Sequence, residues 1–384
     1  MRILIISFEF PPEGGGIGTY AYQNAKNLHL LGLQVTALVL TSKLNAAEIE
    51  KFDRNQNFEI VRYKNIHNKL FFLTYRIIKA LYVINKKKFD LIYIAHMPAG
   101  IIGLLGKVIF RIPYIIIGHG TEILFKARMM YTKLVYWYSD LIIVNSNYTK
   151  KLFEQKNISN KIEVVSPGGD HIIFNPENID ENDLRNRLGL AGKFILLSVG
   201  SLTERKDHAT VLIALKLIIN TCPDLYYLIV GDGPLRNYLL NLIEKLELAS
   251  NVRLCGFAQN QELVTFYKLC DLFILNSKID KYGDVEGFGI VLIEANLMGK
   301  AVIGIKNTGM EEAIEDGKSG LLVQMNDPKD TARAIKLLYS DQQMLASMGQ
   351  YGKKRALEKF TWIKCAEKTK EHITKILNQE NLLF

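Results

Sequence analysis

The segment FILLSVGSLTERKDHATVLIALK (194–216) contains the pattern from which the fold class follows. It opens with an apolar run that ends at a glycine, continues through a polar loop and closes with an amphipathic run at helical spacing. A strand, a loop and a helix in this order form the repeating unit of parallel α/β sheets. The same alternation recurs along the whole chain, so the sequence predicts an α/β protein built on parallel sheets.

Twelve short strands are predicted, six in each half of the chain. They cover 3–8, 35–40, 91–95, 114–118, 141–145 and 162–165, then 194–200, 225–231, 252–256, 272–276, 301–305 and 321–323. Between the halves, SPGGDHIIFNPENID (166–180) has the composition of a linker. We therefore expect two Rossmann-type domains, residues 1–170 and 171–360. They are expected to face each other across a ligand cleft, because ligands sit outside the carboxyl ends of parallel strands.

The composition suits a protein of a reducing compartment. Its 384 residues are enough for two domains, and 48% of them are hydrophobic. The four cysteines are scattered without metal-binding spacing, so neither disulfides nor structural zinc are expected. The first apolar run is too short for a signal peptide, and the most apolar stretch (99–117) is interrupted by Lys107, Arg111 and Pro113. We expect a cytoplasmic protein.

Positive charge is concentrated in the first half. Residues 1–170 carry 22 Lys and Arg against 12 Asp and Glu, whereas residues 171–384 carry 26 against 27. A one-sided basic field indicates a polyanionic partner, which can be an anionic membrane, an acidic acceptor or nucleic acid. Two segments, 69–88 and 124–138, combine cations with large apolar side chains. They are consistent with peripheral binding to an anionic bilayer, although packing on a sheet with a solvated basic face explains each segment alone.

Two carboxylates eight residues apart flank a glycine turn in DVEGFGIVLIEA (284–295). Glu286 is expected in a loop, the N–H groups of Gly287, Phe288 and Gly289 at a helix start, and Glu294 two turns inside that helix. Free N–H groups at a helix start bind anions, and adjacent carboxylates can accept hydrogen bonds from sugar hydroxyls. The arrangement suits a sugar joined to a diphosphate, while a structural loop before a surface helix also fits these residues.

Cations and a histidine follow two other predicted strands. Arg205 and Lys206 end a strand-to-helix loop, where they suit a diphosphate leaving group whose charge grows as the glycosidic bond breaks. His119, in GHGTE (118–122), is placed to hydrogen-bond a transferred sugar. A solvated basic pair and a structural histidine remain alternative interpretations.

Glycine-bearing strand ends complete the predicted cleft. Glycine permits positive φ and close approach of the backbone to a ligand, although each of these turns can also be purely structural. The candidates for nucleotide-sugar binding are Gly15 and Gly16 of PPEGGGIGTY (11–20), Gly231 of GDGP (231–234), and Gly256 with Phe257 at the end of strand 252–256.

Taken in order, these motifs resemble the family-4 retaining glycosyltransferases of the GT-B fold. The resemblance covers nearly the whole chain and is most specific at EGFGIVLIEA. It rests on the GGGIG loop, HGTE, VNSNYTKK (144–151), SPGGD (166–170), the Arg-Lys pair, GDGP, the two glutamates and GKSGLLV (317–323). It implies an N-terminal acceptor domain completed by a C-terminal helix at 361–378, and a C-terminal domain that binds a UDP- or GDP-sugar. The acceptor is expected to be a glycan or glycolipid, such as a lipid-linked or cell-surface polysaccharide precursor.

Residue roles follow from the resemblance. Glu294 would bind the nucleotide ribose and Glu286 the donor sugar, and amides around Gly287–Gly289 would touch the sugar or phosphate. Arg205 and Lys206 would hold the diphosphate, replacing a metal ion or other tightly bound cofactor. The Gly16 amide would lie opposite them, and His119 would contact the transferred sugar.

Two departures from the family pattern affect the phosphate site. Ser201 stands where many relatives carry Arg, and Asp207 where Gly usually follows the cationic pair.

Competing functions are weaker. A nucleotide-sugar 2-epimerase of the same fold would make product from the donor alone. A nicotinamide-dependent oxidoreductase lacks the GxGxxG spacing and the acidic ribose partner. No recognised nucleic-acid-binding motif is present, so no nucleic-acid partner is expected. The expected location is the cytoplasm, with peripheral association at the inner face of the cytoplasmic membrane.

Overall fold

The structure is a computed structural model that describes residues 1–12, 15–41, 45–64, 69–124, 129–158, 161–258 and 260–381. Parts of two predicted segments, residues 13–14 of the first glycine loop and 125–128 of the second basic segment, lie outside the described residues. The chain forms two compact units. Unit 1 comprises Met1–Pro167 and Trp362–Phe384, and unit 2 comprises Gly168–Thr361.

Unit 1 is built on a parallel sheet whose strand order, over the described residues, is β3-β2-β1-β4-β5-β6-β7. The order reverses between β1 and β4, so the loops that follow these two strands diverge at the carboxyl edge. Such a reversal is where ligands enter doubly wound sheets. The strands are β1 (Arg2–Ser7), β2 (Gln34–Leu40), β3 (Glu59–Tyr63), β4 (Leu91–Ile94), β5 (Tyr114–Gly118), β6 (Leu141–Val144) and β7 (Ile162–Val164).

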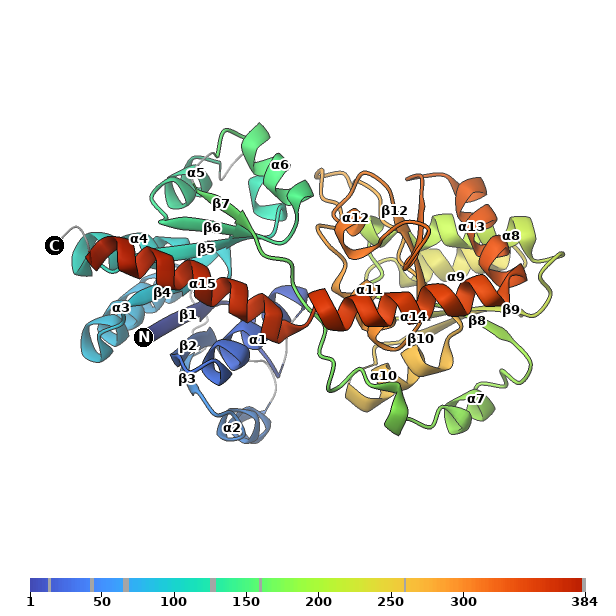
Figure 1. Cartoon of the computed structure of the whole chain (residues 1–384), viewed down its shortest axis with the longest axis horizontal. Helices are drawn as coiled ribbons and strands as arrows, with labels where there is room; N and C mark the ends of the chain where they lie inside the picture. Colours follow the sequence, from blue (N-terminus) through green and yellow to red (C-terminus); the bar gives the residue numbers. More distant parts are fainter. Residues whose placement is uncertain are drawn as a thin grey trace. The chain divides into compact units, whose positions relative to one another are not determined.

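Helices cover both faces of this sheet (Figure 1). Right-handed crossovers place α1 and α2 on one face and α3 to α6 on the other. α15 packs on α1, where the ring of Trp362 meets that of Tyr20 edge-on at 5.8 Å. The helices are α1 (Gly16–Leu30), α2 (Ala46–Arg54), α3 (Lys69–Lys87), α4 (Gly100–Phe110), α5 (Met129–Trp137), α6 (Asn147–Gln155) and α15 (Trp362–Asn381), with 3-10 turns η1 (Met97–Ala99) and η2 (Thr121–Ile123).

Unit 2 repeats the same architecture. In the part of the unit that the structure describes, the parallel strands run in the order β10-β9-β8-β11-β12-β13, reversing between β8 and β11. The strands are near-continuous apolar runs, as expected for a sheet covered on both faces. They are β8 (Phe194–Val199), β9 (Leu225–Val230), β10 (Val252–Gly256), β11 (Leu272–Ile274), β12 (Ala301–Ile305) and β13 (Gly320–Val323).

The helices of unit 2 enclose one hydrophobic core with this sheet. Within the described ranges of the whole chain, no helix is both long and apolar enough to cross a membrane. The helices are α7 (Asn182–Arg187), α8 (His208–Ile218), α9 (Arg236–Lys245), α10 (Asn260–Leu269), α11 (Ile290–Leu297), α12 (Met310–Ala313), α13 (Pro328–Ser340) and α14 (Gln342–Lys359), with 3-10 turns η4 (Pro176–Asn178) and η5 (Glu204–Lys206).

The twelve predicted strands are all present, and the α/β fold class is confirmed. The sequence interpretation missed β3, whose EIVRY contains two charged residues and lies at the edge of the sheet. It also placed Glu294 too deep in its helix. Because α11 begins at Ile290, Glu294 is its fifth residue and lies just beyond the first turn.

Candidate active site

The strand reversal of unit 2 brings two loops together at the carboxyl edge of the sheet. The loop after β8 carries η5, with Arg205 and Lys206, and the loop after β11 carries Glu286. A backbone hydrogen bond joins the loops, because the N–H of Lys278 donates to the carbonyl of Arg205 at 3.0 Å. Residues about 80 positions apart in the sequence therefore share one site.

Arg205 and Lys206 converge on a single carboxylate oxygen. Nη1 of Arg205 lies 2.6 Å and Nζ of Lys206 2.5 Å from Oε2 of Glu286. Nε of Arg205 also lies 3.3 Å from Oδ2 of Asp284. The Glu286 side chain is only 15% exposed, and that of Lys206 10%. The site is thus a largely buried cluster of two cations and two carboxylates.

The two carboxylates of this cluster have opposite pKa shifts. Burial alone would raise the pKa of Glu286, but the charges of Lys206 and Arg205 and their hydrogen bonds outweigh burial and lower that pKa to about 2. Burial raises the pKa of Asp284 to about 6, because the charge of Arg205 offsets only part of the effect of burial. At neutral pH Glu286 is therefore firmly ionised, whereas Asp284 titrates not far below neutrality.

Glu294 is held by a tyrosine from a neighbouring helix. The Tyr267 hydroxyl, on α10, donates to Oε2 of Glu294 at 2.7 Å. The Tyr267 ring is fixed by stacking on Phe273 and by an edge contact with Phe174, each with ring centroids 5.4 Å apart. Burial raises the pKa of Glu294 to about 7; nearby Asp170 raises it further, while the Tyr267 hydrogen bond and Lys206 act in the opposite direction. At neutral pH this carboxyl group is therefore partly protonated, whereas Glu286 is ionised.

The Gly-Phe-Gly turn follows Glu286 and places its phenylalanine side chain in the core. Phe288 is 2% exposed, and its ring lies 5.7 Å from that of Phe360. Gly289 has a φ of 84° and directly precedes α11. A Cβ on Gly309 would lie 1.7 Å from the Gly287 carbonyl oxygen, so glycine is required for this approach. The Phe288 side chain is therefore part of the core rather than of a ligand-contacting surface.

The glycines of the next strand ends hold the edge of the sheet together. The N–H of Gly231 donates to the carbonyl of Gly256 at 2.7 Å, and both residues have positive φ. A Cβ on Gly231 would lie 1.9 Å from the carbonyl oxygen of Gly200. This packing gives Gly231 a structural function whether or not a ligand lies beside it. Phe257, which follows Gly256, is exposed.

The predicted residues of unit 1 lie at its carboxyl edge. His119 follows β5; its backbone N–H donates to Oε1 of Glu122 at 2.9 Å, and its ring Nε2 lies 3.0 Å from the carbonyl of Ala95. Gly15 precedes α1 and Gly16 is its first residue. Neither glycine uses the positive φ that glycine permits, and a Cβ on Gly16 would meet nothing within 4 Å. The Gly16 backbone is therefore openly accessible.

Four residues at these edges were missed by the sequence interpretation. Asp284 contacts Arg205, and Tyr267 contacts Glu294. Glu122 accepts a hydrogen bond from the backbone of His119 and another, at 2.6 Å, from the Tyr136 hydroxyl. His96, two residues after the end of β4, has its pKa lowered to about 4 by burial and by the charge of His119. Its position at a strand end, the same as that of His119, was the available signal.

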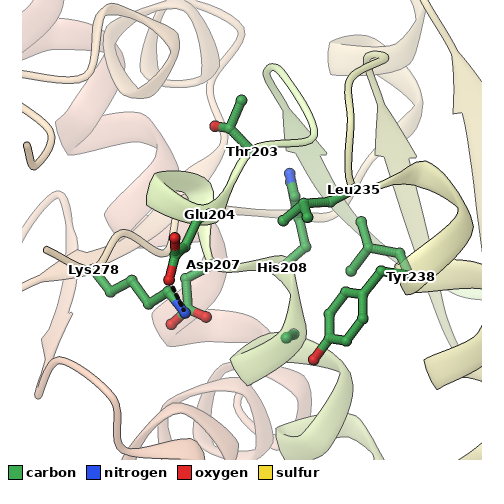
Figure 2. A pocket seen from close by; sticks show the side chains of 9 residues that line it. Thr203, Glu204, Asp207, His208, Leu235, Tyr238 and Lys278 are labelled. Atoms are coloured by element: carbon green, nitrogen blue, oxygen red, sulfur yellow. Dashed lines mark ion pairs between the residues drawn. The ribbon is translucent and has the colours of Figure 1, made fainter. Parts of the chain in front are cut away.

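A separate cavity of about 230 Å³ lies on the other side of η5 (Figure 2). Figure 2 shows Glu204 and Asp207 at this cavity, with Lys278 reaching Glu204 at 3.5 Å. Arg205, Lys206, Glu286 and Glu294 do not line it. Glu204 and Asp207 therefore line the cavity, while the two residues between them, Arg205 and Lys206, contact Glu286. The turn ends at Asp207, whose φ of 38° explains why a glycine would also fit there. No group of three or more potential metal-ligating side chains is found among the described residues.

Comparisons with known proteins agree with this architecture. Residues 14–171 match Glycosyltransferase Family 4, and residues 180–355 match Glycosyl transferases group 1. The chain is 27% identical over 381 residues to an uncharacterised glycosyltransferase of Methanocaldococcus jannaschii, covering 95% of each chain. It is 25% identical to the GDP-mannose-dependent monoacylated alpha-(1-6)-phosphatidylinositol monomannoside mannosyltransferase of Corynebacterium glutamicum, covering 99% of this chain and 98% of that protein.

A solved structure extends the comparison to the fold. The crystal structure of Anabaena HepE in complex with UDP and glucose superposes with a TM-score of 0.81 at 22% identity, covering 97% of this chain and 99% of that one. Together, the two family matches cover both units, and the fold is that of the GT-B glycosyltransferases. The chain therefore belongs to the family-4 glycosyltransferases.

Proposed function

We propose that this protein is a retaining glycosyltransferase that moves a sugar from a nucleoside-diphosphate sugar to an acceptor. The observation that carries the proposal is the convergence of Arg205 and Lys206 on Glu286 at the strand reversal of unit 2. Two cations at such an edge suit a diphosphate, and a carboxylate beside them suits the hydroxyls of the attached sugar. Unit 2 would therefore be the donor domain, corresponding to predicted residues 171–360.

Donor binding would rearrange the ion pairs of the free protein. The diphosphate would take over Arg205 and Lys206, and Glu286 would then accept hydrogen bonds from the donor sugar. Glu294, steadied by Tyr267, would bind the ribose hydroxyls. Amides of Gly287 and Gly289 would contact the sugar or a phosphate oxygen, and the exposed Phe257 would contribute to the wall around the base.

The reaction would exchange one bond at the anomeric carbon for another on the same face. The bond between that carbon and the diphosphate oxygen breaks, and the acceptor oxygen bonds to the carbon while its proton passes to the departing diphosphate. Negative charge grows on the diphosphate, so Arg205 and Lys206 stabilise the transition state more than the ground state. These cations would supply the charge that other enzymes obtain from a metal ion. His119 would orient the transferred sugar and the Gly16 amide would face the diphosphate.

The donor base is proposed to be uracil or guanine. A GDP-mannose-dependent relative favours GDP, whereas a structural neighbour with UDP bound favours UDP. The test is a thermal-shift titration with UDP, GDP, ADP and NAD, because a ligand that binds only the native state raises the melting temperature. We expect stabilisation by UDP or GDP. Stabilisation by NAD alone would overturn the proposal.

The acceptor is proposed to be a lipid-linked or cell-surface glycan precursor bound by the N-terminal domain, residues 1–170 with 361–378. The support is the name of the Corynebacterium relative, whose acceptor is a phosphatidylinositol mannoside, together with the basic charge of residues 1–170. The enzyme would act in the cytoplasm, peripherally at the inner face of the membrane.

Activity is tested by incubating the protein with the stabilising nucleotide's sugars and extracted membrane lipids. When the sugar of the donor is radiolabelled, the label should appear in the lipid fraction. The NMR spectrum of the product should show that the anomeric configuration of the donor is retained. Isomerised donor formed without any acceptor would indicate an epimerase instead.

A further inference from the structure

We propose that the outer face of α3, α4 and α5 in unit 1 is a docking surface for an anionic lipid bilayer. This inference deepens the proposed function, on which it rests for the membrane-bound acceptor. The docking face is defined by eight exposed apolar side chains, contributed by the three helices and the residue that follows α5: Ile78, Tyr82, Val108, Ile109, Met130, Leu134, Trp137 and Tyr138.

α4 differs from a usual sheet-covering helix, because small residues face the sheet and large apolar residues face outward. In GIIGLLGKVIF the residues that face the sheet are largely glycines, and a Cβ on Gly103 or Gly106 would lie 2.7 Å from the Tyr114 ring or 2.3 Å from Ile92. The helix therefore lies close to the sheet, while Val108 and Ile109 are exposed. A helix in contact only with water normally keeps its large apolar residues inward. This helix instead suits a second apolar environment on its outer side.

α5 presents an aromatic stripe beside α4. Met130, Leu134, Trp137 and Tyr138 follow helical spacing along one exposed face, and Trp137 is 74% exposed. The two helices are joined, because the Tyr131 hydroxyl accepts from the Ile101 N–H at 3.2 Å. Trp and Tyr are the side chains that favour the boundary between lipid headgroups and acyl chains. The aromatic content of this stripe thus fits a membrane interface.

α3 adds the third edge of the docking face. It packs on α4, and its exposed Ile78 and Tyr82 are one turn apart. Nζ of Lys86, one turn further, lies 5.7 Å from the Tyr82 ring. An exposed aromatic ring with a lysine above it matches an apolar layer beneath anionic headgroups.

The charge of this region identifies the occupant as anionic lipid. Residues 69–138 carry eleven Lys and Arg against two acids, a surplus equal to the +9 of the whole chain. Both acids are engaged in hydrogen bonds, and two of the eleven cations, Lys87 and Lys107, are ion-paired with Glu59 and Asp140 outside this range. Lys86 and Arg111 are exposed at the helix ends. Exposed apolar side chains flanked by exposed cations match an anionic membrane surface better than a neutral protein partner.

The test is co-flotation of the full chain with vesicles of phosphatidylcholine containing about 40% phosphatidylglycerol, compared with phosphatidylcholine alone, at about 50 mM salt. We expect binding to the anionic vesicles only. Ile109→Gln with Trp137→Gln should abolish most of it, and Lys86→Gln with Arg111→Gln should weaken it on the order of tenfold. The matched controls in unit 2 are Leu217→Gln, whose side chain is 53% exposed against 54% for Ile109, and Lys245→Gln with Lys336→Gln.

Three results would overturn the docking face: no flotation of the wild type, equal loss in the controls, or unchanged binding by the docking-face variants. A fourth result would come from light scattering, which measures the oligomeric state. If the wild type is a dimer and Trp137→Gln is a monomer, the face is a contact between two copies of the chain. The nucleotide thermal shift of each variant is measured in parallel. Binding to vesicles without any nucleotide response would refute the proposed function and leave the docking face standing.

Discussion

Lys206 and Glu286 form an ion pair of 2.5 Å in which both side chains are largely buried. The same carboxylate oxygen also accepts from Arg205, so this one carboxylate contacts both cations, while Asp284 contacts Arg205 alone. Without this carboxylate, two adjacent buried cations would repel each other and lose their solvation. In the free protein Glu286 therefore keeps the two cations close together. In the proposed donor complex, the diphosphate would take over this role.

Glu286→Gln should separate donor binding from transfer. The variant keeps the shape of the side chain but removes the negative charge that competes for Arg205 and Lys206. We expect the affinity for the nucleoside diphosphate to stay the same or to rise, whereas kcat falls about 100-fold or more because a sugar contact is weakened. Calorimetric titration and a transfer assay measure the two effects. A parallel loss of nucleotide affinity would contradict this prediction, and Glu244→Gln, on the exposed face of α9, is the control.

The same substitution should reveal a pH-dependent contribution to stability. The pKa of Glu286 is lowered to about 2 in the folded protein, from an ordinary value near 4.5. A lowered carboxyl pKa stabilises the fold fully above the ordinary pKa, and this contribution is lost as pH falls from about 4.5 toward 2. Glu286→Gln should thus cost on the order of 2 kcal/mol at pH 7 and progressively less near pH 3. Urea unfolding across this range measures the gap, and a gap independent of pH would contradict the assignment.

Glu294 should make donor affinity depend on pH near neutrality. Its pKa is raised to about 7, and hydrogen bonds from ribose hydroxyls would favour the ionised form and lower that pKa on binding. Affinity for the donor should therefore rise between pH 6 and 8 with release of a proton. Calorimetry in buffers of different ionisation enthalpy detects the proton. A nucleoside-diphosphate sugar is the suitable probe because its phosphates do not titrate in this range.

Glu294→Gln provides the test of that assignment. The glutamine can still accept from Tyr267 but cannot ionise, so the pH dependence and the proton release should vanish and affinity at pH 8 should fall by roughly tenfold or more. The raised pKa means that folding loses stability as pH rises from about 4.5 to 7, so the variant should be no less stable than the wild type at pH 8. A large drop in its melting temperature would show that Glu294 is structural.

The positions of the loops could be predicted from the sequence, but their contacts could not. Strand ends were recognisable because buried parallel strands are apolar runs that stop at glycines or polar residues, as at Gly200 and Gly256. Arg205 and Glu286 were assigned to one cleft for this reason. Their direct pairing depends on the register of two loops, fixed by the bond between Lys278 and Arg205. No local pattern encodes that register.

The partner of Glu294 illustrates the same limit. Tyr267 lies 27 residues earlier, on α10, and reaches Glu294 only because its ring packs on Phe273 and Phe174. In the sequence Tyr267 is an ordinary aromatic residue of an amphipathic helix. The raised pKa of Glu294 also depends on burial, which spacing along the chain does not reveal.

Tyr267→Phe should weaken donor binding through Glu294 alone. The ring contacts remain, while the hydroxyl that donates to Oε2 of Glu294 is lost. Because that hydrogen bond favours the ionised carboxylate, its loss should raise the pKa of Glu294 further and shift the midpoint of the affinity–pH curve upward. We expect affinity at pH 7 to fall severalfold, about 1 kcal/mol. Combining the change with Glu294→Gln should add little, and fully additive losses would show that Tyr267 acts independently.

Gly309→Ala should displace the Gly-Phe-Gly turn, because Gly309 packs directly against its backbone. A Cβ at this position would lie 1.7 Å from the carbonyl oxygen of Gly287, and the Gly309 N–H donates to the Glu286 carbonyl at 3.3 Å. Since the obstacle is backbone, the turn must move, and Glu286 with it. We expect at least a tenfold loss of donor affinity, because small displacements of binding groups are costly.

Gly299→Ala is the control: its φ of 75° imposes strain, but no atom lies within 4 Å of the added Cβ. It should lower the melting temperature without changing donor affinity, and equal affinity losses in the two variants would show that strain alone, not displacement of the turn, explains the effect.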